Sequence, residues 1–193
     1  TYPYCMVQFT PSYFSKRSGF VINQLSGGGC EHMGNFPTFP VKGKLKMSPD
    51  NILNYRINIS EEKGHAGYYE AKVQEDIHAK LTVTERTGMA SYEYPADQQY
   101  GTVIIGGGIS ATPIEQAAIV ITAPNKCEGY AEGGNFCGLR TPYKVYFVAE
   151  FDTDALESGT WKRDELKPNT TFAEGEYSGV YFTFDVNKKK NIQ

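Results

Sequence analysis

A run of three glycines with hydrogen-bonding side chains on either side is the stretch of this chain best suited to binding chemistry. The glycines are Gly27, Gly28 and Gly29, and Cys30 follows them directly. Since glycine has no β-carbon, the backbone there can adopt positive φ and let another molecule approach closely. The polar side chains beside the glycines belong to Asn23, Gln24, Ser26, Glu31 and His32. Such groups bind hydroxyl-rich ligands. A glycine-rich hairpin turn without a ligand has the same composition, and composition alone favours that simpler interpretation.

No catalytic set of side chains stands out from the sequence. The three histidines are scattered along the chain, so no Ser–His–Asp arrangement can be assembled. Glycoside hydrolysis uses two carboxyl groups, and Asp152 with Asp154 is a close pair of acids. The two aspartates also fit the end of a strand, and Glu85 beside Arg86 fits a surface ion pair.

Residues 106–111 superficially match the dinucleotide-binding fingerprint, because Gly106 and Gly108 follow an apolar strand and Ala111 takes the third position. That fingerprint needs a helix directly after the glycines, and Pro113 lies where the first turns would run. Residues 26–29 lack the lysine of a phosphate-binding loop. We therefore predict turns at both glycine-rich segments.

The four cysteines contain no Cys-x-x-Cys pair and no histidine at zinc-binding spacing, so a metal cluster is not expected. They are Cys5, Cys30, Cys127 and Cys137. A Cys127–Cys137 bridge across a hairpin is one possible pairing in an oxidising compartment. Four thiols allow three sets of pairings, and free buried cysteines fit equally well.

Periodicity predicts an all-β fold, an antiparallel β-sandwich of many short strands with little helix. Alternating apolar and polar residues indicate strands, and the 14 Tyr and 11 Phe favour sheet. The predicted strands are residues 4–9, 53–59, 69–73, 77–83, 88–94, 102–105, 116–123, 127–131, 143–151 and 177–186. Loops are predicted at residues 61–67 and 133–137. Because residues 143–151 are apolar on both faces, we expect a central strand covered on each side. One sandwich domain over residues 1–193 accounts for the length.

Composition excludes several classes of protein. A net charge of −3 and a pI near 5.7 argue against a nucleic-acid partner or an anionic membrane surface. No apolar run of about twenty residues exists, so no membrane-spanning segment is expected. The sequence starts at Thr1 without features of a signal peptide, so we expect that any export signal has been removed or lay upstream, and that the sequence is an excerpt.

Two blocks of residues resemble one family of enzymes. Residues 25–30, with residues 34–37 and Pro40, resemble a Leu-Ser-Gly-x-Gly-Cys segment in the N-terminal domain of glycoside hydrolase family 92, the bacterial α-mannosidases. Residues 67–69, 79–88 and 94–95 are similar to a second run of the same family. Weaker similarity continues through residues 128–130, 143–151 and 179–185, so the resemblance covers nearly the whole chain in the right order.

The resemblance implies a secreted, periplasmic or cell-surface bacterial enzyme that removes terminal α-linked mannose from glycans with inversion. Such enzymes pack an N-terminal β-sandwich on a C-terminal (α/α)6 barrel, which carries both catalytic carboxylates and is assisted by calcium. No residue of this chain matches the catalytic acid or base. The chain would then contribute pocket-wall loops and the interface with the catalytic domain, and residues 1–193 alone would be inactive.

Chemistry and the resemblance together assign local roles. Gln24 and Ser26 would bond sugar hydroxyls, and Gly27 and Gly28 would allow close backbone approach. The rim would be formed by Cys30, Glu31 and His32. A second glycine-rich loop would add Asn135, Phe136 and Cys137, with the Phe136 ring facing a sugar. The same residues also fit turn geometry or packing against the barrel.

Two departures from the family pattern and two other functions stay open. The family commonly has His-x-His where this chain has Ile22, Asn23 and Gln24, which leaves the linkage preference open.

A non-catalytic carbohydrate-binding module would need an exposed aromatic platform, yet Trp161 is the only tryptophan. A structural or interaction sandwich would expose an apolar patch for a partner. The family's usual opening motif is also absent from this chain.

Overall fold

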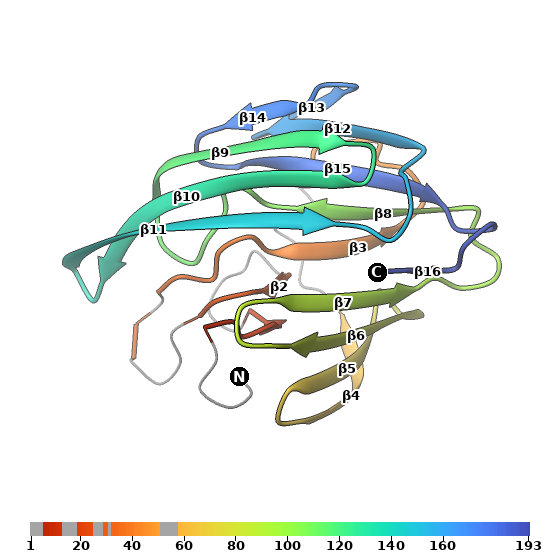
Figure 1. Cartoon of the computed structure of the whole chain (residues 1–193), viewed down its shortest axis with the longest axis horizontal. Coiled ribbons are helices and arrows are strands. Elements are labelled where there is room, and N and C mark those ends of the chain that lie inside the picture. The colour runs from red at the N-terminus through yellow and green to blue at the C-terminus, as the bar shows by residue number, and fades with distance from the viewer. Residues whose placement is uncertain (1–5, 13–18, 25–28, 31, 51–57) are drawn as a thin grey trace.

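The computed structural model describes residues 6–12, 19–24, 29–30, 32–50 and 58–193. Its strands form three antiparallel sheets (Figure 1). Within the described part, helical residues occur only at Pro49 and Asp50, and no helix there is long and apolar enough to cross a membrane. The predicted all-β fold is confirmed.

The largest sheet has seven strands and the next has four. The seven-stranded sheet runs in the order β1 (Thr10–Pro11), β2 (Phe20–Val21), β3 (Thr38–Lys42), β8 (Tyr100–Ile105), β15 (Ser178–Asp185), β12 (Glu157–Lys162) and β13 (Glu165–Pro168). The four-stranded sheet runs in the order β11 (Leu139–Glu150), β10 (Lys126–Phe136), β9 (Ile114–Ala123) and β14 (Phe172–Glu174). In Figure 1 these two sheets lie alongside each other.

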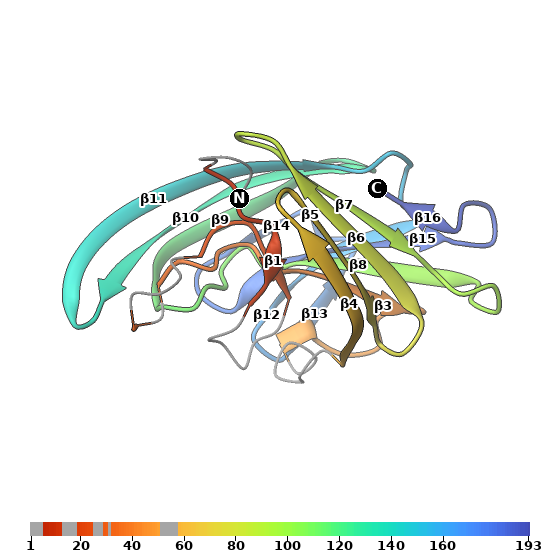
Figure 2. The same ribbon diagram turned by 90° about the horizontal axis from the view of Figure 1, so that it is seen from below.

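The third sheet has five strands, in the order β16 (Asn191–Ile192), β7 (Gly88–Glu93), β6 (Ile77–Val83), β5 (Tyr68–Val73) and β4 (Ile59–His65). Figure 2 shows β4 to β7 running obliquely to the long strands of the other sheets. Residues from all three sheets share one hydrophobic core, with Ile77 and Leu81 from β6, Ile119 from β9 and Phe182 from β15 among its members. This shared core confirms the β-sandwich.

Strands β8 and β15 are both covered on two faces, because each contributes residues to two separate cores. Val180, Phe182 and Phe184 of β15 point into the main core, whereas Tyr181 packs in a second cluster with the fully buried Trp161. The alternation that predicted β15 is therefore real, and buried side chains occupy both sets of its positions. The only tryptophan cannot serve as an exposed sugar platform.

Three of the predicted local structures are wrong. Residues 143–151 were expected to form a covered central strand, but they belong to β11, an edge strand whose outward residues are exposed. The expectation failed because apolar side chains on both faces of a strand do not show whether a second layer covers each face. The predicted loop at residues 61–67 is mostly strand β4, with a turn only at Ala66 and Gly67. Residues 6–9 are not strand, and the predicted strand at 53–59 falls largely outside the described residues.

Candidate functional site

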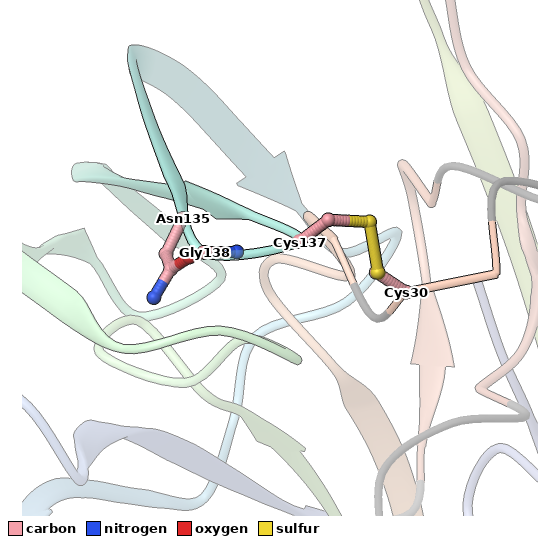
Figure 3. Close-up of a disulfide and its surroundings, with 4 residues drawn as sticks. All are labelled: Cys30, Asn135, Cys137 and Gly138. Carbon is pink, nitrogen blue, oxygen red and sulfur yellow. Dashed lines mark hydrogen bonds between the residues drawn. A yellow bond between two sulfur atoms is a disulfide. The ribbon is translucent and has the colours of Figure 1, made fainter.

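A disulfide joins the glycine-rich loop to the end of the β10–β11 hairpin. Cys30 and Cys137 are bonded, with their Cα atoms 5.5 Å apart across a sequence separation of 107 residues (Figure 3). The proposed Cys127–Cys137 bridge is therefore wrong. Cys127 is a free, buried cysteine, and burial raises the pKa of its thiol to about 12. Cys5 lies outside the described residues.

The hairpin end has a tight geometry that presents Cys137 to the loop. Cys137 and Gly138 both have positive φ, 52° and 83°, and they connect the paired residues Phe136 and Leu139. Two consecutive positive φ values are typical of the type I′ turn, which suits the twist of a β-hairpin. The Asn135 side-chain oxygen accepts a hydrogen bond from the Gly138 amide at 3.0 Å. The predicted loop at 133–137 is thus mainly the end of β10.

Gly134 explains why this strand end is rich in glycine. The register of β10 against β11 shifts between Gly133 and Asn135, and Gly134 has a φ of 141°. A Cβ atom at position 134 would lie 2.0 Å from the carbonyl oxygen of Thr141. Glycine is therefore required by the bulge itself, and this requirement accounts for the residue without any ligand.

His32 lies inside the junction between loop and hairpin. Its side chain is buried, and its ring centroid is 5.2 Å from that of Phe136 and 5.5 Å from that of Tyr143 in an edge-to-face arrangement. The imidazole Nδ1 atom is buried and has no hydrogen-bond partner in the described part of the chain. His32 is therefore an interior residue of the junction rather than the rim residue that the sequence predicted.

Hydrogen bonds hold the two ends of the glycine-rich loop together. Gln24 and Met33 form an isolated antiparallel bridge. The Asn35 amide donates to the Asn23 side-chain oxygen at 2.8 Å, and the Asn23 side chain donates to Asn35 Oδ1 at 3.2 Å. Tyr143 Oη, from β11, donates to the same Asn35 oxygen at 3.1 Å. The loop is thus fastened to the hairpin by a polar contact as well as by the disulfide.

Several buried polar atoms at this junction lack partners. Both side-chain amide atoms of Gln24, and Nδ2 of Asn35, are buried and have no hydrogen-bond partner among the described residues. A buried polar atom without a hydrogen bond costs about 1–3 kcal/mol. With the Nδ1 atom of His32, the junction therefore holds four buried polar atoms that the described residues leave without a partner.

The segment after β8 forms a third wall of the junction. The Ala111 amide donates to the Met33 carbonyl at 2.8 Å. The buried hydroxyl of Thr112 has no hydrogen-bond partner within the ranges that the structure describes. Gly107 and Gly108 form a turn, as predicted. A Cβ on Gly108 would lie 2.0 Å from the Gly175 carbonyl oxygen, so close packing, and not dinucleotide binding, explains this glycine.

Six of the ten predicted site residues are described, and the structure gathers them at the junction: Gln24, Cys30, His32, Asn135, Phe136 and Cys137. The other four, Ser26, Gly27, Gly28 and Glu31, lie outside the described residues. Sequence reasoning missed Asn35 and Tyr143. Asn35 stands in a family-like block, but nothing near Tyr143 in the sequence indicates its contact with a residue more than one hundred positions away.

Two acidic side chains near the end of the hairpin, and Asp152 beyond β11, are paired. Glu132 contacts Lys144 at 3.2 Å and Glu115 contacts Arg140 at 3.2 Å. Asp152, which follows β11, binds Lys189 at 2.6 Å and accepts a bond from the Gln193 amide, as its position at a strand end suggests. Within the described residues no group of three or more His, Cys, Asp or Glu side chains could hold a metal ion.

The whole chain matches one family model. Residues 1–193 match the glycosyl hydrolase family 92 N-terminal domain. The chain belongs to this family. The resemblance seen in the sequence is therefore confirmed, and the loop–hairpin junction is a feature of a family 92 N-terminal domain. No curated protein matches the sequence.

Solved structures of family 92 share the fold. A family 92 glycosyl hydrolase superposes with a TM-score of 0.82 at 18% identity, covering 100% of this chain and 28% of the other. An inverting mannosidase of the family from Bacteroides thetaiotaomicron superposes with a TM-score of 0.80 at 21% sequence identity, and the match covers 100% of this chain and 27% of the other. For an α-mannosidase from the same organism the TM-score is 0.74 at 21% identity, and the match covers 96% of this chain and 29% of the other. This chain thus spans less than a third of each of these proteins.

Proposed function

We propose that this chain is the N-terminal domain of an exo-acting, inverting α-mannosidase and that its loop–hairpin junction forms part of the wall of the mannose pocket. The observation that carries the proposal is the family match over all 193 residues. It is supported by the structural likeness to an inverting mannosidase and to an α-mannosidase of the family. The substrate would be terminal α-linked mannose on glycans.

The catalytic carboxylates are proposed to lie in the region that follows this domain. Inversion needs two carboxyl groups about 6.5–9.5 Å apart, with a water molecule between the base and the sugar. By the resemblance to the family, no residue of this chain matches the catalytic acid or the catalytic base. The isolated chain should therefore be inactive.

The junction would contribute binding and shape. The unpaired amide of Gln24 can both donate to and accept from a sugar hydroxyl. The Nδ1 atom of His32 can donate or accept one hydrogen bond, according to the tautomer of the ring, once a neighbouring group reaches it. Phe136 would supply apolar surface, although its ring already packs on His32. Ser26, Gly27, Gly28 and Glu31 remain candidates for direct contact.

Cys30, Cys137 and Asn135 are assigned a positioning role. The two cysteines are bonded to each other in the disulfide, and the Asn135 side-chain oxygen accepts the hydrogen bond from the Gly138 amide in the turn. These residues would fix the loop relative to the hairpin, which lowers the entropy that must be lost when a ligand binds. They would not themselves bond the sugar through these atoms.

Calcium and export are the remaining parts of the proposal. Among the described residues, no group of three or more His, Cys, Asp or Glu side chains could supply the carboxylates that a calcium site usually contains. We therefore place the ion in the catalytic barrel. The Cys30–Cys137 disulfide supports a periplasmic, cell-surface or secreted location, since disulfides persist in oxidising compartments.

Mannose release from α-linked mannobiosides tests the proposal. The full-length protein that contains this chain, the parent protein, should release mannose, and a calcium chelator should stop the release. Residues 1–193 alone should release none. Gln24→Ala should weaken the parent's activity by about tenfold, since a lost hydrogen bond to a sugar is worth about 1.5 kcal/mol. Gln98→Ala, in the connection between β7 and β8, is the matched control. A parent that releases no mannose from any linkage would contradict the assignment and favour a binding or structural sandwich.

A further inference from the structure

The outer face of the four-stranded sheet is unusually apolar for a surface that faces solvent. Tyr146 is 70% exposed, Val148 61% and Phe172 54%. Together with Tyr130 and Val120, these side chains border an open groove of about 390 Å³. An antiparallel sheet with one face in water normally places polar residues there. Such a patch of neighbouring apolar side chains is typical of an interaction surface.

Cross-strand pairing shows how this face is built. On β10 and β11, the outward pairs are Lys126 with Glu150, Glu128 with Val148, Tyr130 with Tyr146, and Glu132 with Lys144. The first and last are ion pairs, at 3.5 and 3.2 Å. The two middle pairs are mainly apolar. An apolar centre with charged groups at its edges is the usual anatomy of a protein interface.

One charged side chain stands within the apolar centre. Glu128 lines the groove and is exposed, and no ion pair to it is found among the described residues. Two outward pairs further along the hairpin, Lys144 is instead held by Glu132 and lies over the Tyr130 ring at 4.3 Å. A partner that covers this face should therefore offer apolar side chains and one hydrogen-bond donor or cation to Glu128.

The end of the chain lies beside this sheet. The Asp152 amide, just after β11, donates to the Gln193 carbonyl at 3.0 Å, and the Gln193 amide donates to Asp152 Oδ1 at 3.2 Å. Figures 1 and 2 both place the C-terminus beside the end of β11. A chain that continues past Gln193 thus starts at the border of the apolar face.

We propose that the outer face of β9, β10, β11 and β14 is the docking surface for the region that follows this domain in the intact enzyme. The inference rests on the proposed function, in which this chain is the first part of a longer protein. The family 92 structures with the same fold are more than three times as long as this chain. The lining of the groove is mostly apolar, which suits the side chains of a protein partner. A glycan on the exposed aromatic rings is the alternative that the experiment below separates.

Thiol labelling in the parent enzyme tests this surface. Val148→Cys and Phe172→Cys place thiols at two separate points of the face, and Lys80→Cys on the exposed side of β6 is the control. Each labelling rate is compared with the rate for the same thiol in the urea-unfolded protein, with peptide mapping to identify the labelled cysteine. Both face thiols should react at least about tenfold more slowly in the folded parent, whereas Lys80→Cys should react within about threefold of the unfolded rate.

Each outcome decides the proposal. Face thiols that react as fast as the control would overturn it. Protection that disappears on dilution would assign the face to a second copy of the protein, and protection only with added mannan would assign it to glycan; both would also overturn it. The measurement does not use mannose release, so a protected parent without mannosidase activity would contradict the proposed function and still support the docking surface.

Discussion

Removing the Cys30–Cys137 disulfide is expected to lower the free energy of unfolding of residues 1–193 by about 3–5 kcal/mol. The bond closes a loop across 107 residues, for which the loss of chain entropy in the unfolded state corresponds to about 5 kcal/mol. Cys137 is exposed and Cys30 is half-buried, so serine at both positions should remove little packing. The cross-link itself should therefore dominate the change.

Urea unfolding followed by tryptophan fluorescence measures this change. Trp161 is the only tryptophan and is fully buried in the core beside β15, so its emission reports loss of the fold. Cys30→Ser, Cys137→Ser and the double variant should unfold at the same urea concentration. The melting temperature should fall by about 10 °C, given about 2–4 °C for each kcal/mol in a chain of this size.

Reduction of the unchanged chain provides the control. A reductant should shift its unfolding curve to that of the double variant and leave the double variant unaffected. The reasoning would be refuted by a difference below about 1 kcal/mol between the two oxidised proteins, far less than a 107-residue loop implies. A Cys127→Ala variant that loses its sensitivity to reductant would show that Cys127 forms the bond instead.

Three further predictions concern side chains away from the disulfide. Tyr143→Phe should cost about 0.5–1.5 kcal/mol in urea unfolding because its bond to the loop is lost, whereas Tyr146→Phe on the exposed face should cost almost nothing. Gly108→Ala should destabilise by about 3 kcal/mol or more, since its Cβ would meet the Gly175 carbonyl oxygen; normal stability would disprove that close approach. The raised pKa of Cys127 should make the free energy of unfolding fall between pH 9 and about 12, by up to about 1.4 kcal/mol per pH unit, because the unfolded thiol ionises first. Cys127→Ala should flatten that slope, and an unchanged slope would contradict the burial effect.

Alternation of apolar and polar residues was sufficient to predict the strands that have one face in contact with solvent. β6 places Ile77, Ala79 and Leu81 inside while His78 and Lys80 face solvent, as the sequence predicts. Short-range rules work here because the period of two is set by the pleat of a single strand. In β11 the expectation that apolar side chains are covered was wrong, since Tyr146 and Val148 are apolar and yet exposed.

The candidate site was predicted as a group of residues but not as an arrangement. Glycine content and polar side chains pointed to Gln24 and His32, and a second glycine-rich segment pointed to Phe136. That His32 is buried between Phe136 and Tyr143 depends on how β10 and β11 fold back over the loop. A contact between residues more than one hundred positions apart leaves no periodic signal in either segment.

The sequence by itself determined the all-β class, most of the strands and membership of family 92, because these depend on local side-chain alternation and on blocks of residues in order. Only the tertiary structure decided that Cys30 pairs with Cys137, that Gly108 is required by packing, and that apolar side chains of β11 and β14 are exposed on one sheet face. These features depend on which strands become neighbours. That choice is made by burial summed over the whole core, which no single stretch of sequence contains.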